Sequence, residues 1–495
     1  MSTAETLLYL LPELLLLLTA ALVFALDLVW RHDPERQRQW VPGVAIGGLA
    51  VALIVTLALM AGHPNVRVAW LMAVDPLALF FKVIAIIGVA MVLASALDYI
   101  PGRTPYVGEF YALLIAAGLA ISITVSASDL ILLYLGLEFL SITSYVLTGY
   151  LKRDRRSIEA ALKYFLYGAA ASAVMLYGMS LLYGATGTTD LEAIARVLSG
   201  DVSGEMTLLG FPAVALLLVG FSFKASLVPF HQWAPDAYEG APTPVTAFLS
   251  TASKATGFAV MARVLLVGLP MFQEREWVPI LAALSMVTMT FGNLVAIQQS
   301  NIKRLLAYSS IAQAGYILIG LVALSQNPTF NGLNGLLIYL FAYLFTNIGA
   351  FVVVIAVESA TGAVDLPGYA GLVRRSPLLA GMLLIFLLSL TGIPPTGGFL
   401  GKLFVFGAAI QAKFLSLAIV GIVNSAIAAF YYLNVVRYMF FMPAPEGQEA
   451  KPIALAPGVQ TTLWVCLAMT FLIGIYAQPF ITWATRSASF LVSAL

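Results

Sequence analysis

The sequence predicts an all-α membrane protein of about fourteen transmembrane helices, two of them broken. Of its 495 residues 61% are hydrophobic and only 10% are charged, and the mean hydropathy is +0.95. A typical soluble domain has about 25% charged residues. Many of the apolar runs reach the roughly 20 residues that a helix needs to cross a bilayer. These observations predict a chain that crosses the membrane many times.

The predicted spans follow one another in a single membrane domain, residues 1–495, without a gap long enough for a soluble domain. The first span, Leu7–Trp30, is too long for a signal-peptide core and no small-residue cleavage site follows it, so we expect it to be retained. The spans are expected at residues 7–30, 41–61, 74–97, 108–126, 129–150, 161–184, 207–231, 244–266, 278–297, 303–324, 332–358, 377–406, 412–436 and 459–484.

Spans 4–8 (residues 107–266) and spans 9–13 (residues 278–440) form a weak internal repeat, flanked by helices 1–3 and 14. The fourth span of each repeat contains helix breakers: Pro229 interrupts span 7, and Pro394 with Pro395 interrupts span 12. Five spans per repeat is an odd number, so the second copy must cross the membrane in the inverted direction. Broken helices at matching positions of inverted halves indicate a transporter-type site.

The distribution of basic residues predicts the orientation. Loops after odd-numbered spans contain 14 lysines and arginines, whereas loops after even-numbered spans together with the C-terminus contain 5. Because cytoplasmic loops carry the excess of positive charge, the odd-numbered loops should face the cytoplasm and both termini the opposite side. We expect the inner membrane of a bacterial cell, with both termini periplasmic; an organelle membrane is the alternative.

Composition excludes several classes of site. A single cysteine, Cys466, permits neither an intrachain disulfide nor a thiolate cluster. Of the three histidines, only His231 lies near membrane depth, so a haem held by paired histidines is not expected. The formal net charge of +1 gives no indication of a nucleic-acid partner.

Three lysines lie within apolar spans: Lys224, Lys254 and Lys402. A charged amine at the centre of a membrane helix costs about 2.5–3.5 kcal/mol and usually marks a functional site. Lys224 and Lys402 lie beside the helix breaks, and broken helices at membrane depth occur only where they pack in protein or line a hydrated cavity. The alternatives are a kink in a packed helix for the break after Lys224, a snorkelling lysine for Lys254, and pairing with a neighbouring subunit's carboxylate for Lys402. The arrangement favours an ion path.

Three further ionisable residues are candidates for the same path. Glu138 is an acid near the middle of span 5; a carboxylate there would stabilise the charged form of a nearby amine, whereas burial destabilises it. It could instead be a structural acid satisfied by serine or threonine hydroxyls. His231 is seven residues after Lys224 and would share its helix face only in a regular helix. Lys163 lies beside a basic loop and could either take part or extend to the membrane surface.

Three motifs carry a resemblance to a known family. PFHQWAPDAYEGAPTPVTAFLSTASK (229–254), KRLLAYSSIAQAGY (303–316) and GIPPTGGFLGK (392–402) resemble the antiporter-like membrane subunits of respiratory complex I, across spans 4 to 13. Within this family the chain is most similar to the N-type members. M-type members have a glutamate where this chain has Lys402, and L-type members have a long C-terminal lateral helix. The chain is also similar to the B subunit of cyanobacterial and plastid NAD(P)H dehydrogenases.

The resemblance implies a proton-translocating subunit of NADH:quinone oxidoreductase that couples quinone reduction to proton transport. Glu138 is then the span-5 acid, Lys224 its partner, Lys254 the connecting lysine and Lys402 the exit-side lysine. No cofactor is expected in this chain; NADH, FMN, iron–sulfur clusters and quinone would be bound by other subunits. The expected partners are the neighbouring antiporter-like and small membrane subunits and the lipid bilayer, with no nucleic acid.

The chain departs from the family pattern at Gln313, where many relatives have histidine. We find no titrating side chain between Lys254 and Lys402 in spans 10 and 11, so polar groups would have to order water there: Tyr308, Gln313, Tyr339, Tyr343 and Asn347. Two other functions are considered. One is a subunit of a multisubunit cation/proton antiporter or a membrane-bound hydrogenase. The other is a passive assembly scaffold, which the cost of the buried basic residues argues against.

Overall fold

The structure, a computed structural model, describes residues 2–492 except 201–204, 326, 328–329 and 445–451. In this part of the chain, eleven helices are long and apolar enough to cross a membrane, and shorter apolar stretches lie in three more. The eleven are α2 (Leu11–Val29), α3 (Pro34–Ala61), α4 (Pro76–Ala96), α5 (Val107–Ser126), α6 (Leu130–Thr148), α7 (Arg155–Thr186), α13 (Val278–Ala296), α14 (Ile302–Val322), α15 (Gly332–Thr361), α19 (Leu415–Phe441) and α20 (Pro457–Ile475). The other three are α9 (Glu205–Ala225), α17 (Pro377–Thr391) and α18 (Gly397–Gln411).

Shorter elements connect these helices. A two-stranded antiparallel hairpin, which the all-α prediction does not include, consists of β1 (Val66–Val68) and β2 (Met72–Val74). The helical elements are α1 (Thr3–Tyr9), α8 (Leu191–Ser199), α10 (Trp233–Gly240), α11 (Thr243–Phe248), α12 (Lys254–Arg263), α16 (Leu372–Arg375) and α21 (Gln478–Val492). Three π turns, η1 (Leu249–Ser253), η2 (Val264–Gly268) and η4 (Gln273–Trp277), and two 3₁₀ turns, η3 (Pro270–Phe272) and η5 (Leu366–Tyr369), complete the set.

The prediction of an all-α membrane protein is confirmed, and several span boundaries are corrected. Span 7 ends as a helix at Ala225, because residues 226–232 form turns around Pro229. Span 8 consists of α11, η1, α12 and η2 rather than one α-helix. The predicted spans 377–406 and 459–484 each contain two helices, α17 with α18 and α20 with α21. Span 1 begins at Leu11, because Leu10 separates it from α1.

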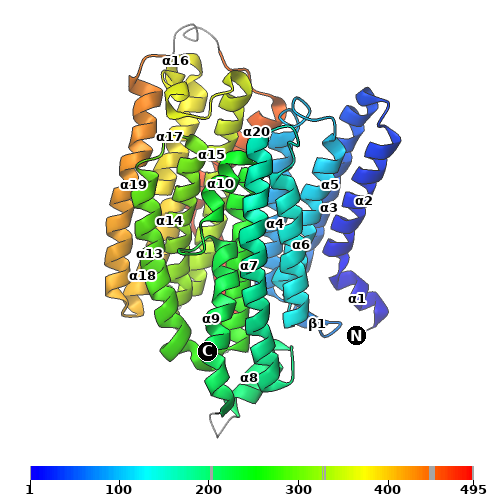
Figure 1. The fold of residues 1–495 in the computed structure, drawn as a ribbon, viewed down its shortest axis with the longest axis vertical. Helices are drawn as coiled ribbons and strands as arrows, with labels where there is room; N and C mark the ends of the chain where they lie inside the picture. The colour runs from blue at the N-terminus through cyan, green and yellow to red at the C-terminus, as the bar shows by residue number, and fades with distance from the viewer. Residues whose placement is uncertain (1, 201–204, 326, 328–329, 445–451, 493–495) are drawn as a thin grey trace.

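Burial divides the helices into an inner and an outer set. The most apolar window of α15 is buried throughout, and that of α14 is 94% buried, whereas those of α2, α3, α7, α19 and α20 are a third buried or less. Large apolar side chains are exposed on the outer helices, as expected for surfaces that face lipid or other subunits. Figure 1 shows that α14 and α15 run roughly parallel to the other long helices of the bundle.

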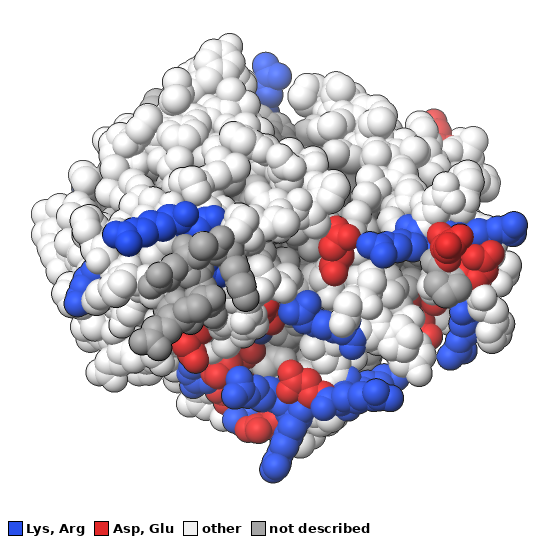
Figure 2. Space-filling model, turned by 90° about the horizontal axis from the view of Figure 1, so that it is seen from above, with Lys and Arg blue, Asp and Glu red and all other residues white. Residues whose placement is uncertain are grey.

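The two ends of the bundle differ. Figure 1 shows α16 at one end, and β1, α8 and both marked chain ends toward the other. At that second end the hairpin packs on the loop before α6, where Ser128 N donates to Leu71 O over 2.8 Å. Seen from the α16 end, the charged side chains gather on part of the surface and the rest is uncharged, as Figure 2 shows.

Candidate functional site: a polar axis through the bundle

The three span lysines are all buried in the bundle. Lys224 is 4% exposed, Lys254 1% and Lys402 4%. Each lies where a helix departs from regular α geometry: Lys224 in the last turn of α9, Lys254 directly after the π turn η1, and Lys402 one turn after the break between α17 and α18. The sequence places Lys224 and Lys402 beside helix breaks, as the structure does, whereas the irregular turn before Lys254 was not predicted.

The break after Lys224 is held open by hydrogen bonds from two neighbouring segments. Trp233 Nε1 donates to Phe223 O over 3.0 Å, and Val228 N donates to Thr288 Oγ1 of α13 over 3.0 Å. The last turn of a helix has carbonyls without intrahelical donors, and Phe223 O accepts from the indole in addition to Ser226 N, 3.1 Å away. Trp233 also stacks on Tyr164 of α7, with ring centroids 4.1 Å apart. The local fold thus fixes the position of Lys224.

Glu138 lies across from this break on α6 but does not contact Lys224. Its carboxylate accepts a hydrogen bond from Ser172 of α7, and it lies close enough to Lys224 to interact electrostatically. Within the described residues, Lys224 Nζ has neither a hydrogen bond nor an ion pair. The predicted partners Glu138 and Lys224 therefore do not form an ion pair in the structure. Their charges interact only over a longer distance. Glu138 is partly exposed on the outer face of α6.

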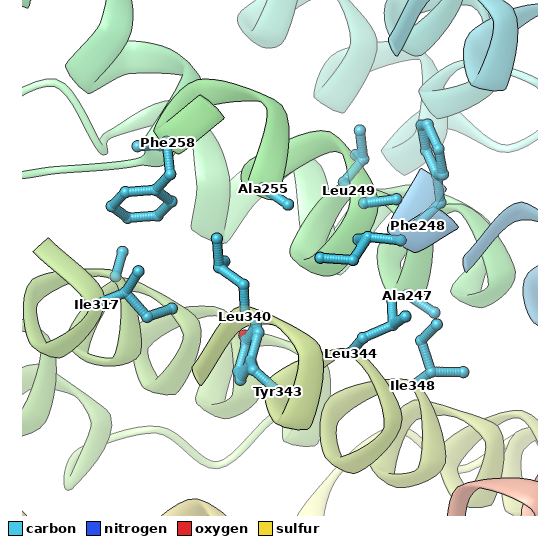
Figure 3. Packing of buried hydrophobic residues seen from close by; sticks show 14 of the residues in the cluster. Ala247, Phe248, Leu249, Ala255, Phe258, Ile317, Leu340, Tyr343, Leu344 and Ile348 are labelled. Carbon is cyan, nitrogen blue, oxygen red and sulfur yellow. The ribbon is translucent and has the colours of Figure 1, made fainter. Parts of the chain in front are cut away.

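Lys254 is fixed by a direct contact with α14. Its Nζ donates to Ser310 O over 2.8 Å and to Ser310 Oγ over 2.5 Å. The segment that carries it is held by apolar packing: Figure 3 shows side chains of α11, η1 and α12 against those of α15 and α14, labelled at Ala247, Phe248, Leu249, Ala255, Phe258, Ile317, Leu340, Tyr343, Leu344 and Ile348. Gly257 lets α12 approach α9 closely, because a Cβ there would lie 3.0 Å from Ala225 N.

Several buried polar atoms between Lys224 and Lys254 lack a hydrogen-bond partner among the described residues. They are Ser222 Oγ, Lys224 Nζ, Ser226 Oγ, Tyr238 OH, Tyr343 OH and Asn347 Oδ1. Three of them are close to one another: the Tyr238 hydroxyl faces Ser226 and Ser310, and the Tyr343 hydroxyl faces Ser310 and Tyr238. Buried polar groups are nearly always satisfied by protein or by ordered water. The polar atoms of this cluster therefore have hydrogen-bonding capacity that the described residues do not use.

Gln313, by contrast, is fully paired by protein groups. Its Nε2 donates to Leu390 O over 2.9 Å and to Tyr432 OH over 3.3 Å. Tyr339 OH donates to its Oε1 over 2.5 Å. The sequence predicts that Gln313 and Tyr339 order water between them, whereas the two side chains bond directly. The unsatisfied groups lie on the Lys254 side of Gln313, so the part of the path that needs water is displaced from where the sequence places it.

Tyrosines and an asparagine continue the axis from α14 to α18. Ser309, next to the Lys254 partner Ser310, shares a hydrogen bond of 2.5 Å with Tyr432 OH on α19. Tyr431 OH donates to Asn293 Oδ1 over 3.1 Å. Asn293 Nδ2 donates to Tyr316 OH over 2.9 Å. The ring of Tyr316 lies beneath the Lys402 amine, with Nζ 4.4 Å from its centroid, a cation–π distance.

Lys402 reaches back across the break to the end of the preceding helix. Its Nζ donates to Thr391 O over 2.8 Å and to Ser425 Oγ of α19 over 3.0 Å. Thr391 and Leu390, the Gln313 acceptor, are the last two residues of α17, whose final carbonyls lack intrahelical donors. Gly392, at φ +95°, leaves the room that Lys402 needs, because a Cβ there would lie 2.8 Å from Lys402 Cδ.

His231 and Lys163, the other two candidates from the sequence, lie in different parts of the structure. His231 is buried beside Lys224's break, edge-on to Phe291 at 4.8 Å, but it lies outside α9, so the two do not share a helix face. Lys163 is 42% exposed at its side chain and pairs with Asp236 and Glu159, each at 2.9 Å. It belongs to a surface ion cluster with Arg304, 2.6 Å from Asp236, and not to the axis.

The same cluster fixes the charge of Asp236. Burial alone would raise the pKa of its carboxyl, but hydrogen bonds from Lys163 and Arg304 outweigh this effect and lower the pKa. Asp236 is therefore ionised at neutral pH. Because it lies on α10, immediately after the break, this cluster anchors α10 to α7 and α14.

Two other buried ion pairs join the first helices to the bundle. Lys82 Nζ on α4 lies 2.6 Å from Glu13 Oε1 on α2. Arg263 Nη1, at the end of α12, lies 2.8 Å from Asp75 Oδ2 at the start of α4. Breaking a buried pair leaves an uncompensated charge, which costs about 3–5 kcal/mol. Lys82, Asp75, Glu13 and Arg263 therefore stabilise the packing of the first helices against the bundle.

Sequence reasoning missed about half of the axis. It did not identify Ser172, Ser310, Asn293, Tyr316, Tyr431 and Tyr432, all of which contact an axis residue. Polar residues within apolar spans were the available signal, but tyrosines also occur at membrane interfaces, so the signal was ambiguous. Tyr308, which the sequence suggested, forms no hydrogen bond among the described residues.

No group of three or more histidine, cysteine, aspartate or glutamate residues in the described chain is placed to hold a metal ion. The hydrogen-bonded atoms of the axis are hydroxyls, amides, backbone carbonyls and amines. Of these groups, the amines and hydroxyls carry exchangeable protons, whereas the backbone carbonyls only accept hydrogen bonds.

Comparison with known proteins places the chain in a family. Residues 127–428 match the family described as NADH:quinone oxidoreductase/Mrp antiporter, transmembrane. The chain is 42% identical over 472 residues to NADH-quinone oxidoreductase subunit N of Moorella thermoacetica, covering 95% of this chain and 97% of that one. It is 41% identical to NAD(P)H-quinone oxidoreductase subunit 2 of Microcystis aeruginosa, with coverage of 97% and 93%.

Solved structures give the same result. A chain of respiratory complex I from Thermus thermophilus, with bound aureothin, is 32% identical, with a TM-score of 0.79 over 95% of this chain and 98% of that chain. A chain of the Mrp complex from Dietzia sp. has a TM-score of 0.84 at 22% identity, over 99% and 98% of the two chains, which shows a shared fold. The resemblance stated from the motifs is confirmed: the chain belongs to the antiporter-like membrane-subunit family of NADH:quinone oxidoreductases and Mrp antiporters.

Proposed function

We propose that this chain is a proton-translocating membrane subunit of an NADH:quinone oxidoreductase of the complex I type, with Glu138, Lys224, Lys254 and Lys402 as its carriers. The observation that carries the proposal is the polar axis of buried amines at helix irregularities. Lys254 bonds Ser310, whose neighbour Ser309 bonds Tyr432, and Lys402 lies over the ring of Tyr316, which bonds Asn293. A buried amine that can release and regain a proton is a carrier, whereas the surrounding apolar core excludes bulk water and ions. His231 and Lys163 are not needed for this path.

The route has two kinds of segment. Between Lys224 and Lys254 the unpaired hydroxyls and the Asn347 oxygen supply the two to four polar partners that a bound water requires. Between Lys254 and Lys402 protein groups hydrogen-bond directly through Gln313 and the tyrosines. We expect ordered water in the first segment. In the segment between Lys254 and Lys402, we expect hydroxyls to pass the proton from one amine toward the other, and the carbonyls at the end of α17 to stabilise its charge.

The subunit's architecture in the membrane is part of the proposal. We infer fourteen spans, counting the segments 207–231 and 244–266 and each broken helix as one crossing, and two inverted repeats at 107–266 and 278–440. The paired breaks support this arrangement, although the lysines are not equivalent: Lys224 precedes its break and Lys402 follows its own. Both termini are inferred to be periplasmic, in the inner membrane of a bacterial cell.

The chain is proposed to work without a cofactor of its own, so that redox energy comes from other subunits. Glu138 supports the presence of a neighbouring membrane subunit, because a carboxylate partly exposed on the outer face of α6 would otherwise face lipid. The neighbour would cover α6 and α7, whose outer faces carry Ile131, Leu135, Phe165 and Leu166. A cation/proton antiporter shares the fold, but its likeness at 22% identity supports the fold alone.

The proposal is tested by Lys254→Met in the assembled complex. Methionine keeps the length and apolar stem but removes the proton carrier, whose contribution to a transfer step is about 10²–10⁴-fold. We expect quinone-coupled proton pumping in membrane vesicles to fall by that order. Lys413→Met, at an exposed lysine outside the axis, is the matched control and should leave pumping near the wild-type rate. Wild-type pumping in an assembled Lys254→Met complex would refute the proposal.

A further inference from the structure

A hollow of about 650 Å³ lies at one end of the bundle, away from the polar axis. It is enclosed by the end of α2, the start of α3, the connection from α4 to α5 and the start of α20. Its walls are partly apolar, with Val41, Pro42 and Leu97. Trp40, beside it on α3, is 55% exposed, as expected for an aromatic residue at the membrane–water boundary. The hollow thus opens where lipid headgroups lie.

Charges of both signs line this hollow. Arg31 and Arg38 supply positive charge, and Asp98 and Glu109 supply negative charge. Arg38 lies 3.6 Å from Asp98, with its side chain 75% exposed, so this pair is open to solvent and weak. Arg31 has only a distant contact with the ring of Tyr106, at 6.0 Å. Side chains of both positive and negative charge therefore remain available to a ligand.

Two acids, Asp27 and Glu109, lie on one side of the hollow, and hydrogen bonds fix the position of Asp27. Asp27 is 5% exposed and accepts hydrogen bonds from Gly108 N over 3.0 Å and from Gln37 Nε2 over 2.5 Å, which fixes the start of α5. A Cβ at Gly108 would overlap the Asp27 carboxylate, so the close approach requires glycine. Glu109, the next residue, forms no hydrogen bond or ion pair with any described residue.

A ligand that satisfies this lining carries an anion and a cation on one small group, joined to an apolar body. An anionic phospholipid would satisfy the arginines but would be repelled by Asp98 and Glu109. We propose that the hollow binds the headgroup of a zwitterionic phospholipid with a primary amine, phosphatidylethanolamine. Its phosphate lies at Arg31 and Arg38, its ammonium at Glu109 and Asp98, and its acyl chains lie against the outward face of α3.

The test uses the purified complex, equilibrated with equal amounts of phosphatidylethanolamine and phosphatidylglycerol, and the retained lipid is measured by mass spectrometry. A photoreactive phosphatidylethanolamine, cross-linked and mapped to peptides, separates this site from other bound lipid. The wild type should cross-link at peptides of α3 and α5. Glu109→Gln removes the ammonium's partner and should reduce that cross-link about tenfold, the effect expected of one charge-assisted contact. It should also shift retention toward phosphatidylglycerol.

Arg31→Gln should reduce the cross-linking of phosphatidylethanolamine and the retention of both lipids, because it removes the phosphate's partner. Glu35→Gln and Arg374→Gln are matched controls: both residues are exposed and neither lines the hollow. Their cross-linking should equal that of the wild type. Three results would overturn the proposal: a wild-type preference for phosphatidylglycerol, equal cross-linking in wild type and Glu109→Gln, or cross-links from this hollow to a neighbouring subunit in place of lipid.

Discussion

At the scale of single residues, the break between α17 and α18 shows how a lysine is kept inside the bundle. The last carbonyls of α17 have no donors in their own helix, and Lys402 and Gln313 bind two of them in succession. The partial negative charge at the C-terminus of a helix favours a cation there, typically by about 0.3–1 kcal/mol at exposed sites and more where buried. The break therefore creates the site that the amine occupies.

Substitution of Lys402 can show whether its amine carries a proton or only supplies a positive charge. Arginine keeps the positive charge and can bind Thr391 O, but it does not lose its proton in a protein. If Lys402 passes a proton on, Lys402→Arg should lower pumping nearly as much as Lys402→Ala, by on the order of 10²-fold. Pumping driven by NADH oxidation in inverted vesicles is the measurement. Recovery of most of the pumping in Lys402→Arg, but not in Lys402→Ala, would show that only the charge matters.

The sequence identified the charged residues of the axis, and the neutral ones came only from the structure. Buried lysines stand out in an apolar span because their cost is large, so Lys224, Lys254 and Lys402 could be chosen from the sequence alone. Tyr432 and Asn293 could not, because their place in the axis depends on how α19 packs against α13 and α14. The distance between Glu138 and Lys224 likewise depends on tertiary packing, which the spacing of residues does not reveal.

At the scale of elements, the irregular turns set the positions of the amines. The proline break after α9 was predictable from the residue type, because proline lacks a backbone donor. The π turn η1 before Lys254 was not, because nothing in LSTAS distinguishes it from an α-helical turn. π turns occur often at functional sites. The boundary between α20 and α21 was missed although Pro479, the second residue of α21, marks it in the sequence.

Trp233→Phe tests how the first break is held. Phenylalanine preserves ring packing on Tyr164 but removes the indole hydrogen bond to Phe223 O, which leaves that carbonyl with Ser226 N as its only donor and costs about 0.5–1.5 kcal/mol. We expect faster amide hydrogen exchange in residues 222–232 of the assembled complex, with pumping reduced. Trp40→Phe, at an exposed tryptophan, should change neither. Unaltered exchange in Trp233→Phe would show that the indole does not support the break.

At the scale of the whole molecule, burial is concentrated around α14 and α15 and the outer helices present apolar surface. This division fits a subunit that packs among others while keeping its polar axis away from lipid. The overall class was predictable because composition alone separates membrane from soluble chains. The hairpin β1–β2 was not, because six residues of strand carry too little pattern to stand out between long helices.

Orientation can be measured with introduced thiols, because the natural cysteine, Cys466, is fully buried. Trp70→Cys, at a hairpin position that is 86% exposed, should react with a membrane-impermeant maleimide from the periplasmic side of intact spheroplasts. Glu35→Cys, exposed at the start of α3, should react only after the membrane is opened. The reverse pattern would invert the orientation inferred from the lysine and arginine distribution.

The most direct test of the central claim is the ratio of protons pumped to electrons transferred in a Lys224→Ala complex reconstituted in liposomes. Lys224 begins the axis and has no other hydrogen-bonded role among the described residues, so removing its amine should break the path while the subunit still assembles. The account predicts a ratio below that of the wild type, with coupled quinone reduction also lowered. An assembled Lys224→Ala complex with the wild-type ratio would contradict it.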